Sequence, residues 1–222
     1  MKIQYEPRYI HGRLFIDLKP EYVEVILETL SNGWKLALAS STYSLTPDIC
    51  EVKINECLRE GMRRVVNKKQ PSPKRLRMRV ERGMESVSTP SVMTPDGLTD
   101  IPLTLLGDPL LEAEHDPHVI IECKRIEESD SRLCRDYVNE GMDRFIKGKY
   151  GENHAIGFMV GYVLSGLPSG SVSKINSYLK NQSRSKDSLK SSSSNTNSTW
   201  YSRHSRPKPP KSLCLYHAFL VF

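Results

Sequence analysis

Apolar residues recur every three or four positions in two stretches near the start of the chain. The first spans residues 18–34, with Pro20 near its start and Gly33 near its end, and it predicts an amphipathic helix. The second spans residues 46–66 and opens with a Thr-Pro pair, which suits a helix N-cap followed by the first helical position. The apolar stripe of this second helix consists of Ile54, Leu58, Met62 and Val65.

Strand-like patterns dominate after residue 75. Residues 76–81 alternate apolar side chains with arginines, which is the period of a half-exposed strand. Residues 98–107 form another candidate strand, and Pro102 within it predicts an edge position or a bulge. The remaining predicted elements are a strand at 118–126, a helix from residue 129 or 130 to 148, a strand at 154–164, a helix at 171–182 and a strand at 212–222. This order predicts an α/β fold with a mixed central sheet flanked by helices.

The serine-rich stretch at residues 183–199 determines the predicted domain organisation. Its low complexity predicts a flexible insertion, which we place at residues 183–211. The predicted core spans residues 45–182 and is completed by the apolar strand at 212–222. Residues 1–44 are predicted to be a helical and extended decoration of that core.

The composition changes this picture only modestly. Hydrophobic residues make up 38% of the 222 positions and charged residues 26%, as in ordinary soluble globular proteins. The net charge of +6 is a mild bias towards an anionic partner. The five cysteines are odd in number and lack metal-binding spacing, which predicts reduced thiols in a cytoplasmic protein. No signal peptide or membrane-spanning run is evident, so no membrane association is expected.

Several functional classes find no support in the sequence. There is no glycine-rich phosphate loop at a strand-to-helix turn and no nucleophile elbow, so nucleotide hydrolysis and acyl transfer are disfavoured. His217 lies in the apolar segment at the end of the chain. We therefore predict a buried, hydrogen-bonded core histidine rather than a catalytic base.

An acid-x-Lys tripeptide occurs at three places, which is close to chance, so its context must decide which one matters. The three begin at Asp17, Glu51 and Glu122. Only Glu122 and Lys124 stand at the end of an apolar strand that follows another strand bearing an acid, Asp100. Side chains at i and i+2 share one face of a strand, so Glu122 and Lys124 should project together while Cys123 points into the core.

If the strand of Asp100 lies alongside, its carboxylate meets that of Glu122. Two carboxylates so close repel each other unless a cation lies between them. Oxygen ligands of this kind suit Mg²⁺ or Mn²⁺, which keep several waters and accept phosphate as a further ligand. The metal would activate a water molecule, and Lys124 would orient it or offset charge in the transition state. The expected chemistry is hydrolysis of a phosphodiester.

The pattern "TDIPL…VIIECKRI", an acid on one strand and Glu-x-Lys on the next, resembles the PD-(D/E)XK nuclease superfamily with its restriction-endonuclease-like fold. The resemblance covers residues 45–165. It implies that Asp100 and Glu122 bind the metal, that Cys123 contributes its main-chain carbonyl, and that Lys124 assists catalysis.

Many members of that superfamily also place a glutamate on the preceding helix, facing the site. Glu51 is the candidate because it lies on the apolar stripe of the helix at 46–66, and Glu56 is the second choice. The literal Pro-Asp pair of this chain ends at Asp96, before a glycine, and suggests a turn. We therefore prefer Asp100 as the first ligand, in departure from the family's literal pattern.

Basic residues follow the candidate site on the helix at 130–148. The nuclease interpretation assigns some of them to backbone phosphates, and the alternative is a solvated helix face. The candidates for nucleic-acid binding are Arg132, Arg135, Arg144 and Lys147. The expected substrate is DNA, and fold-level analogy adds phage defence as a biological setting.

Two other functions stay open at this point. One is a catalytically silent nucleic-acid-binding or scaffold protein of the same fold. The other is an effector nuclease that needs a partner or ligand for activation. A homodimer would suit cleavage of both strands of a duplex, although no interface is evident in the sequence.

Overall fold

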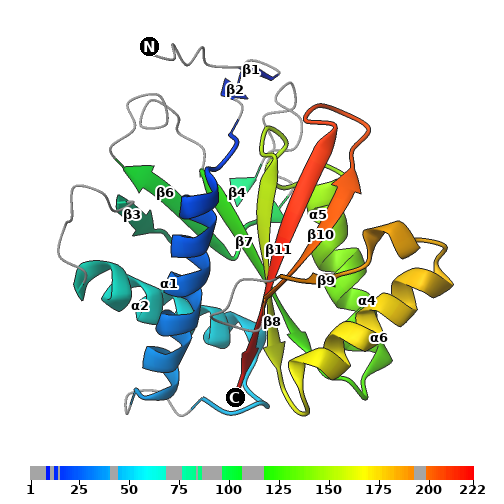
Figure 1. Cartoon of the computed structure of the whole chain (residues 1–222). Coiled ribbons are helices and arrows are strands. Elements are labelled where there is room, and N and C mark those ends of the chain that lie inside the picture. Colours follow the sequence, from blue (N-terminus) through cyan, green and yellow to red (C-terminus); the bar gives the residue numbers. More distant parts are fainter. Residues whose placement is uncertain are drawn as a thin grey trace.

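The computed structural model describes residues 9–10, 13–14, 16–40, 45–68, 77–83, 85–86, 97–106, 118–192 and 199–222. Their centre is a seven-stranded mixed sheet (Figure 1). In spatial order its strands are β3 (Arg77–Val80), β6 (Ile101–Leu106), β7 (Val119–Ile126), β8 (Ile156–Val163), β11 (Ser212–Val221), β10 (Thr199–Ser205) and β9 (Lys190–Ser191). Two short antiparallel pairs lie outside it, namely β1 (Tyr9–Ile10) with β2 (Arg13–Leu14) and β4 (Glu85–Ser86) with β5 (Gly97–Leu98).

Strands β7, β8 and β11 are parallel and form the middle of the sheet, while the outer strands pair antiparallel. Parallel strands need cover on both faces. One face is covered by α1 (Pro20–Leu38) and α2 (Glu51–Lys68). The other is covered by α4 (Ser131–Tyr137), the π-helical turn η1 (Val138–Met142), α5 (Asp143–Ile146) and α6 (Pro168–Asn181) (Figure 1). The predicted α/β class with a mixed, helix-flanked sheet is therefore confirmed.

Helices α1 and α2 cross where Gly33 meets Gly61. A Cβ atom on Gly61 would overlap the carbonyl oxygen of Gly33, so only glycine permits the two backbones to lie this close. The prediction that α1 ends near Gly33 is wrong, because this glycine serves helix packing rather than termination. The predicted start of α2 at a Thr-Pro pair is also wrong, since residues 47–49 form a turn and the helix begins at Glu51.

Helix α1 is part of the core rather than a decoration. Its Ile26 and Leu30 are completely buried in the same cluster as α2 and the sheet. The indole Nε1 of Trp34 donates a hydrogen bond to the carbonyl of Val221 at 2.7 Å, which joins the helix to the last strand. In the described part of the chain no helix, α1 included, is long and apolar enough to cross a membrane.

The edge position predicted for the strand of Pro102 is wrong, because β6 lies between β3 and β7. The last residue pair between β3 and β6 is Val80 with Leu103, and Pro102 is the next residue of β6 beyond that pair. The N–H and C=O of one strand residue point to the same neighbour, and the carbonyl of Pro102 accepts a hydrogen bond from Glu81 at 3.0 Å. The missing N–H therefore faces the side on which β3 has already ended.

The flexible insertion predicted at residues 183–211 is wrong for much of its length. It contains a 3₁₀ turn, η2 (Ser185–Asp187), and the strands β9 and β10. Strand β10 pairs antiparallel with β11 from Thr199 to Ser205. Its serines, histidine and arginine hide the strand pattern, although Ser202 and His204 are buried. Residues 193–198 lie outside the described part of the chain.

Candidate active site

The candidate site forms where β6 separates from β7. Pairing between the two strands stops at Ile101 and Ile121, whereas β7 continues to Ile126 alongside β8. The freed edge of β7 therefore exposes backbone groups that β6 does not satisfy. The N–H of Cys123 donates to Asp100 Oδ2 at 2.8 Å. Next along the edge, the N–H of Arg125 donates to the Oε2 of a glutamate on helix α2.

That glutamate is Glu51, the first residue of α2. Its Oε2 accepts from the backbone N–H of Arg125 at 2.9 Å, and its Oε1 lies 3.2 Å from Lys124 Nζ. Glu56 instead contacts Arg59 on the same helix. The structure therefore selects Glu51 over Glu56 as the helix glutamate that faces the site. Asp96, the residue of the literal Pro-Asp pair, lies outside the described residues.

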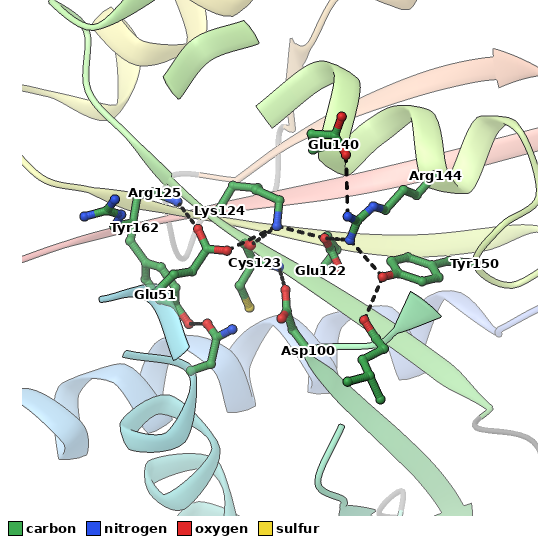
Figure 2. A network of polar contacts seen from close by, with 12 residues as sticks. Glu51, Asp100, Glu122, Cys123, Lys124, Arg125, Glu140, Arg144, Tyr150 and Tyr162 are labelled. Atoms are coloured by element: carbon green, nitrogen blue, oxygen red, sulfur yellow. Dashed lines mark hydrogen bonds and ion pairs between the residues drawn. The ribbon is translucent and has the colours of Figure 1, made fainter. Parts of the chain in front are cut away.

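Glu122 and Lys124 project from the same face of β7, as predicted. Lys124 Nζ lies 2.9 Å from Glu122 Oε1 and also donates to the carbonyl of Cys123 at 2.9 Å. The Cys123 side chain is fully buried on the opposite face, in the core formed with α1 and α2. Figure 2 shows Glu51, Lys124 and Glu122 converging above Asp100. Carboxylates from α2 and β7, those of Glu51 and Glu122, thus contact one lysine ammonium, and Asp100 lies near enough to affect its pKa.

Burial makes the Glu122 carboxylate unstable as an isolated anion. The side chain is 1% exposed, and burial followed by the charge of Asp100 raises its pKa to about 8, against the opposing effect of Lys124. Burial also raises the pKa of Asp100. Glu122 Oε2 is buried and has no donor among the described residues. The neighbouring carboxyl is that of Asp100, so a proton or a cation between the two would relieve their repulsion.

Arg144, on α5, is the second cation at Glu122. Its Nη1 donates to Glu122 Oε1 and to the hydroxyl of Tyr150, at 2.9 and 2.8 Å, and Nη2 lies 3.5 Å from Glu140 (Figure 2). The Tyr150 hydroxyl in turn donates to the carbonyl of Leu98 at 2.7 Å. The sequence analysis proposed Arg144 for phosphate contacts but missed Tyr150, for which no sequence signal exists.

The other basic candidates lie away from this cluster. Arg132 is exposed, Arg135 pairs with Asp136, and Lys147 pairs with Asp143 at 3.2 Å. Within the described residues none of the three makes a polar contact with the carboxylates of the site. Their assignment to nucleic-acid binding stays a prediction.

The chain matches no family model, and no curated protein or solved structure is significantly similar to it. The functional proposal therefore rests on the geometry of the site.

The donor set fits a hard divalent cation that keeps much of its water. No three His, Cys, Asp or Glu side chains within the described ranges are arranged to enclose a metal ion. The available donors are the carboxylates of Asp100 and Glu122, together with the carbonyl oxygen of Cys123, which has a second lone pair besides that used by Lys124. Mg²⁺ binds in proteins through one or two carboxylates, with water and substrate oxygens completing its shell.

A second polar cluster resembles a catalytic triad in its connections. Asp187 can only accept as a carboxylate, so His204 Nδ1 donates to it at 3.0 Å and His204 Nε2 accepts from Ser202 Oγ at 2.7 Å. Ser202 Oγ then accepts from His217 Nε2, and His217 Nδ1 accepts from the Tyr137 hydroxyl. Ser202 is buried with both hydrogen-bonding directions occupied, so it is no nucleophile. The prediction that His217 is a hydrogen-bonded core histidine is confirmed.

This chain of hydrogen bonds makes folding sensitive to acid. Burial, and then the charge of His204, hold the pKa of His217 well below its usual 6.5. The unfolded chain therefore takes up a proton near pH 6.5 that the folded protein refuses, and stability present above that pH is lost as the pH falls. We expect the stability advantage of the wild type over His217→Gln to shrink between pH 7 and pH 5, by up to about 1.4 kcal/mol per pH unit.

Urea unfolding of both proteins at several pH values measures this difference. Comparing two proteins that share every carboxyl group removes the contribution of Glu122, whose raised pKa has the opposite sign. A difference independent of pH would show that His217 is not kept neutral by its surroundings.

Proposed function

We propose that this protein is a metal-dependent nuclease that hydrolyses phosphodiester bonds, with DNA as the first substrate to test. The observation that carries the proposal is the meeting of the Asp100 and Glu122 carboxyls beside Lys124 Nζ, which lies 2.9 Å from Glu122 Oε1. Buried carboxylates that face each other lower the stability of the fold, and groups with such raised pKa values cluster at functional sites. A net charge of +6 is compatible with a polyanionic substrate.

We further propose that the fold is restriction-endonuclease-like and that the site is of the PD-(D/E)XK kind. The support is the order of elements that carry the residues. Glu51 opens a helix, Asp100 precedes β6, and Glu122 and Lys124 lie on the adjacent strand β7. The departure lies in Asp100, which stands in place of a literal Pro-Asp pair.

The chain's own groups have distinct tasks in this proposal. Asp100, Glu122 and the Cys123 carbonyl would hold the divalent cation. When bound, the cation acidifies a water molecule and stabilises charge that develops on the phosphoryl oxygens. Lys124 donates hydrogen bonds from a fixed ammonium, because Glu51, Glu122 and the Cys123 carbonyl all contact it. These three acceptors occupy its three N–H groups, so Lys124 would offset negative charge from a fixed position and would orient the attacking water once Glu51 or Glu122 releases it.

The reaction balances without any further reactant. The oxygen of a water molecule forms a bond to phosphorus while one bridging P–O bond breaks. The departing oxygen takes up a proton, and the water loses one to the solvent. The products are one phosphate monoester end and one hydroxyl end.

The proposal is tested by incubating the protein with linear and circular DNA, and with RNA, in Mg²⁺, Mn²⁺ or EDTA. We expect cleavage only with metal, and its loss in Asp100→Asn and in Glu122→Gln, which are nearly isosteric and remove one carboxylate each. Cleavage that persists in EDTA, or that both variants retain, would place the activity elsewhere. Nucleic-acid binding without cleavage under any condition would favour a silent binding module of the same fold.

A further inference from the structure

Arg144 and Lys124 both contact Glu122 Oε1, each at 2.9 Å. A single buried carboxylate oxygen thus carries two cationic partners. Because Lys124 remains in place, Arg144 can leave without stranding the Glu122 charge. The two cations differ in exposure, since the Lys124 side chain is 14% exposed and that of Arg144 is 29% exposed. The guanidinium therefore lies where a ligand arriving from solvent can reach it.

Metal and phosphate offset each other's charge in the buried part of the cluster. With their protons displaced by a metal ion, Glu51, Asp100 and Glu122 face Lys124 and Arg144, which leaves one negative charge in excess apart from the exposed Glu140. A divalent cation converts this to one positive charge in excess. A phosphodiester carries one negative charge, which restores neutrality. In a buried site an unbalanced charge is expensive, so metal and phosphate favour each other.

We infer that Arg144 exchanges partners during the reaction cycle: it contacts Glu122 before the metal binds and then binds the substrate phosphate, which couples metal binding to substrate binding. This inference rests on the proposed nuclease function. It also assigns a substrate feature, because the exchange needs a phosphodiester anion beside the metal. A guanidinium is suited to this since it binds phosphate oxygens through two parallel N–H groups.

Tyr150 is the positioning residue in this exchange. Its hydroxyl accepts from Arg144 Nη1 and donates to the carbonyl of Leu98, two residues before Asp100. It thereby fixes the guanidinium relative to the segment between β5 and β6 that carries Asp100. Glu140 lies at 3.5 Å on the exposed side and offers the guanidinium a partner away from Glu122. Arg144 therefore has contacts both towards the metal ligands and towards the rim of the site.

The test measures Mn²⁺ affinity in the absence of DNA, and then cleavage, for wild type, Arg144→Gln and Tyr150→Phe. We expect Arg144→Gln to bind Mn²⁺ about tenfold more tightly, because a cation competing for Glu122 is gone. The same variant should cleave DNA about a hundredfold more slowly, because the phosphate loses its guanidinium. Tyr150→Phe, which removes only a hydroxyl, should shift both quantities in the same directions by smaller factors. Arg64→Gln, a change to an exposed arginine on α2 that pairs with Glu60 outside the cluster, is the matched control and should leave both unchanged.

Tighter Mn²⁺ binding together with slower DNA cleavage distinguishes this role of Arg144 from structural damage, which would weaken both. Mn²⁺ affinity that is unchanged or lower in Arg144→Gln would overturn the exchange, as would wild-type cleavage by that variant. If wild-type protein neither binds Mn²⁺ nor cleaves DNA, the proposed function itself fails, and that result is distinguishable from a failure of the exchange alone.

Discussion

Replacing Lys124 with alanine is expected to lower the rate of metal-dependent DNA cleavage by about a hundred- to a thousandfold, the usual effect of removing one fixed transition-state donor. The ammonium is held in place by Glu51, Glu122 and the Cys123 carbonyl, and alanine supplies no cation at this position. Steady-state cleavage of circular DNA in Mg²⁺ measures the effect. The loss should appear in kcat rather than in metal affinity. Lys124→Ala removes no metal ligand, whereas Asp100→Asn and Glu122→Gln each remove one.

The matched control is Lys53→Ala. Lys53 belongs to another acid-x-Lys tripeptide of the chain but is exposed on α2. It should cleave at the wild-type rate. Lys124→Ala should remain folded, because Arg144 still contacts Glu122 and a carboxyl with a pKa of about 8 can hold a proton. Equal cleavage by the wild type and Lys124→Ala would contradict the assigned role.

Replacing Arg206 with alanine is expected to lower the free energy of unfolding by about 3 to 5 kcal/mol. The buried guanidinium donates to five carbonyl groups, one in α5 and four in the segment between α5 and β8, and burial lowers its pKa to about 10. The acceptors belong to Phe145, Tyr150, Gly151, Glu152 and His154. Its loss removes the donor of the Tyr150, Glu152 and His154 carbonyls in a buried site, which is costly, whereas the carbonyls of Phe145 and Gly151 still accept from the N–H groups of Gly148 and His154.

Chemical unfolding at pH 7 measures this change, with Arg203→Ala as the control. Arg203 lies three residues earlier and is exposed on β10, so its removal should cost less than about 0.5 kcal/mol. Arg206→Lys should recover only part of the stability, since an ammonium cannot serve five separate acceptors. A small effect of Arg206→Ala would mean that solvent reaches these carbonyls readily.

The sequence predicted the middle of the sheet because its strands are continuous apolar runs. β7, β8 and β11 are parallel and buried on both faces. Such strands are recognisable from the run of apolar residues alone, without knowledge of their neighbours in the fold. β10 has no such signal. Its inward side chains include Ser202 and His204, which are tolerated inside only because Asp187 and His217 supply hydrogen bonds from elsewhere in the chain.

The part of the candidate site that could be predicted is the part in which the spacing of residues along a strand or helix determines where their side chains point. The i, i+2 relation places Glu122 beside Lys124, and helical periodicity places Glu51 on the face of α2 that meets the sheet. Tyr150 was not predictable, because its position depends on a loop between Gly148 and Gly151, whose φ angles are +77° and +55°. Such backbone conformations suit glycine, but the two residues between these glycines do not reveal where the tyrosine points.

The contact between Arg144 and Glu122 was also beyond the sequence. It depends on the π-helical turn η1, which changes the direction of the side chains that follow it. The predicted helix at 130–148 assumed regular periodicity. π-helical turns are rare and often accompany functional sites, which agrees with the place of η1 beside this cluster.

The most direct test of the site is anomalous diffraction from crystals grown with Mn²⁺. The proposal predicts one strong peak in contact with Glu122 Oε2 and the Asp100 carboxylate, and the absence of that peak in crystals of Glu122→Gln. A saturating Mn²⁺ concentration that gives no peak between these two carboxylates, with Lys124 and Arg144 still paired to Glu122, would contradict the metal-dependent site.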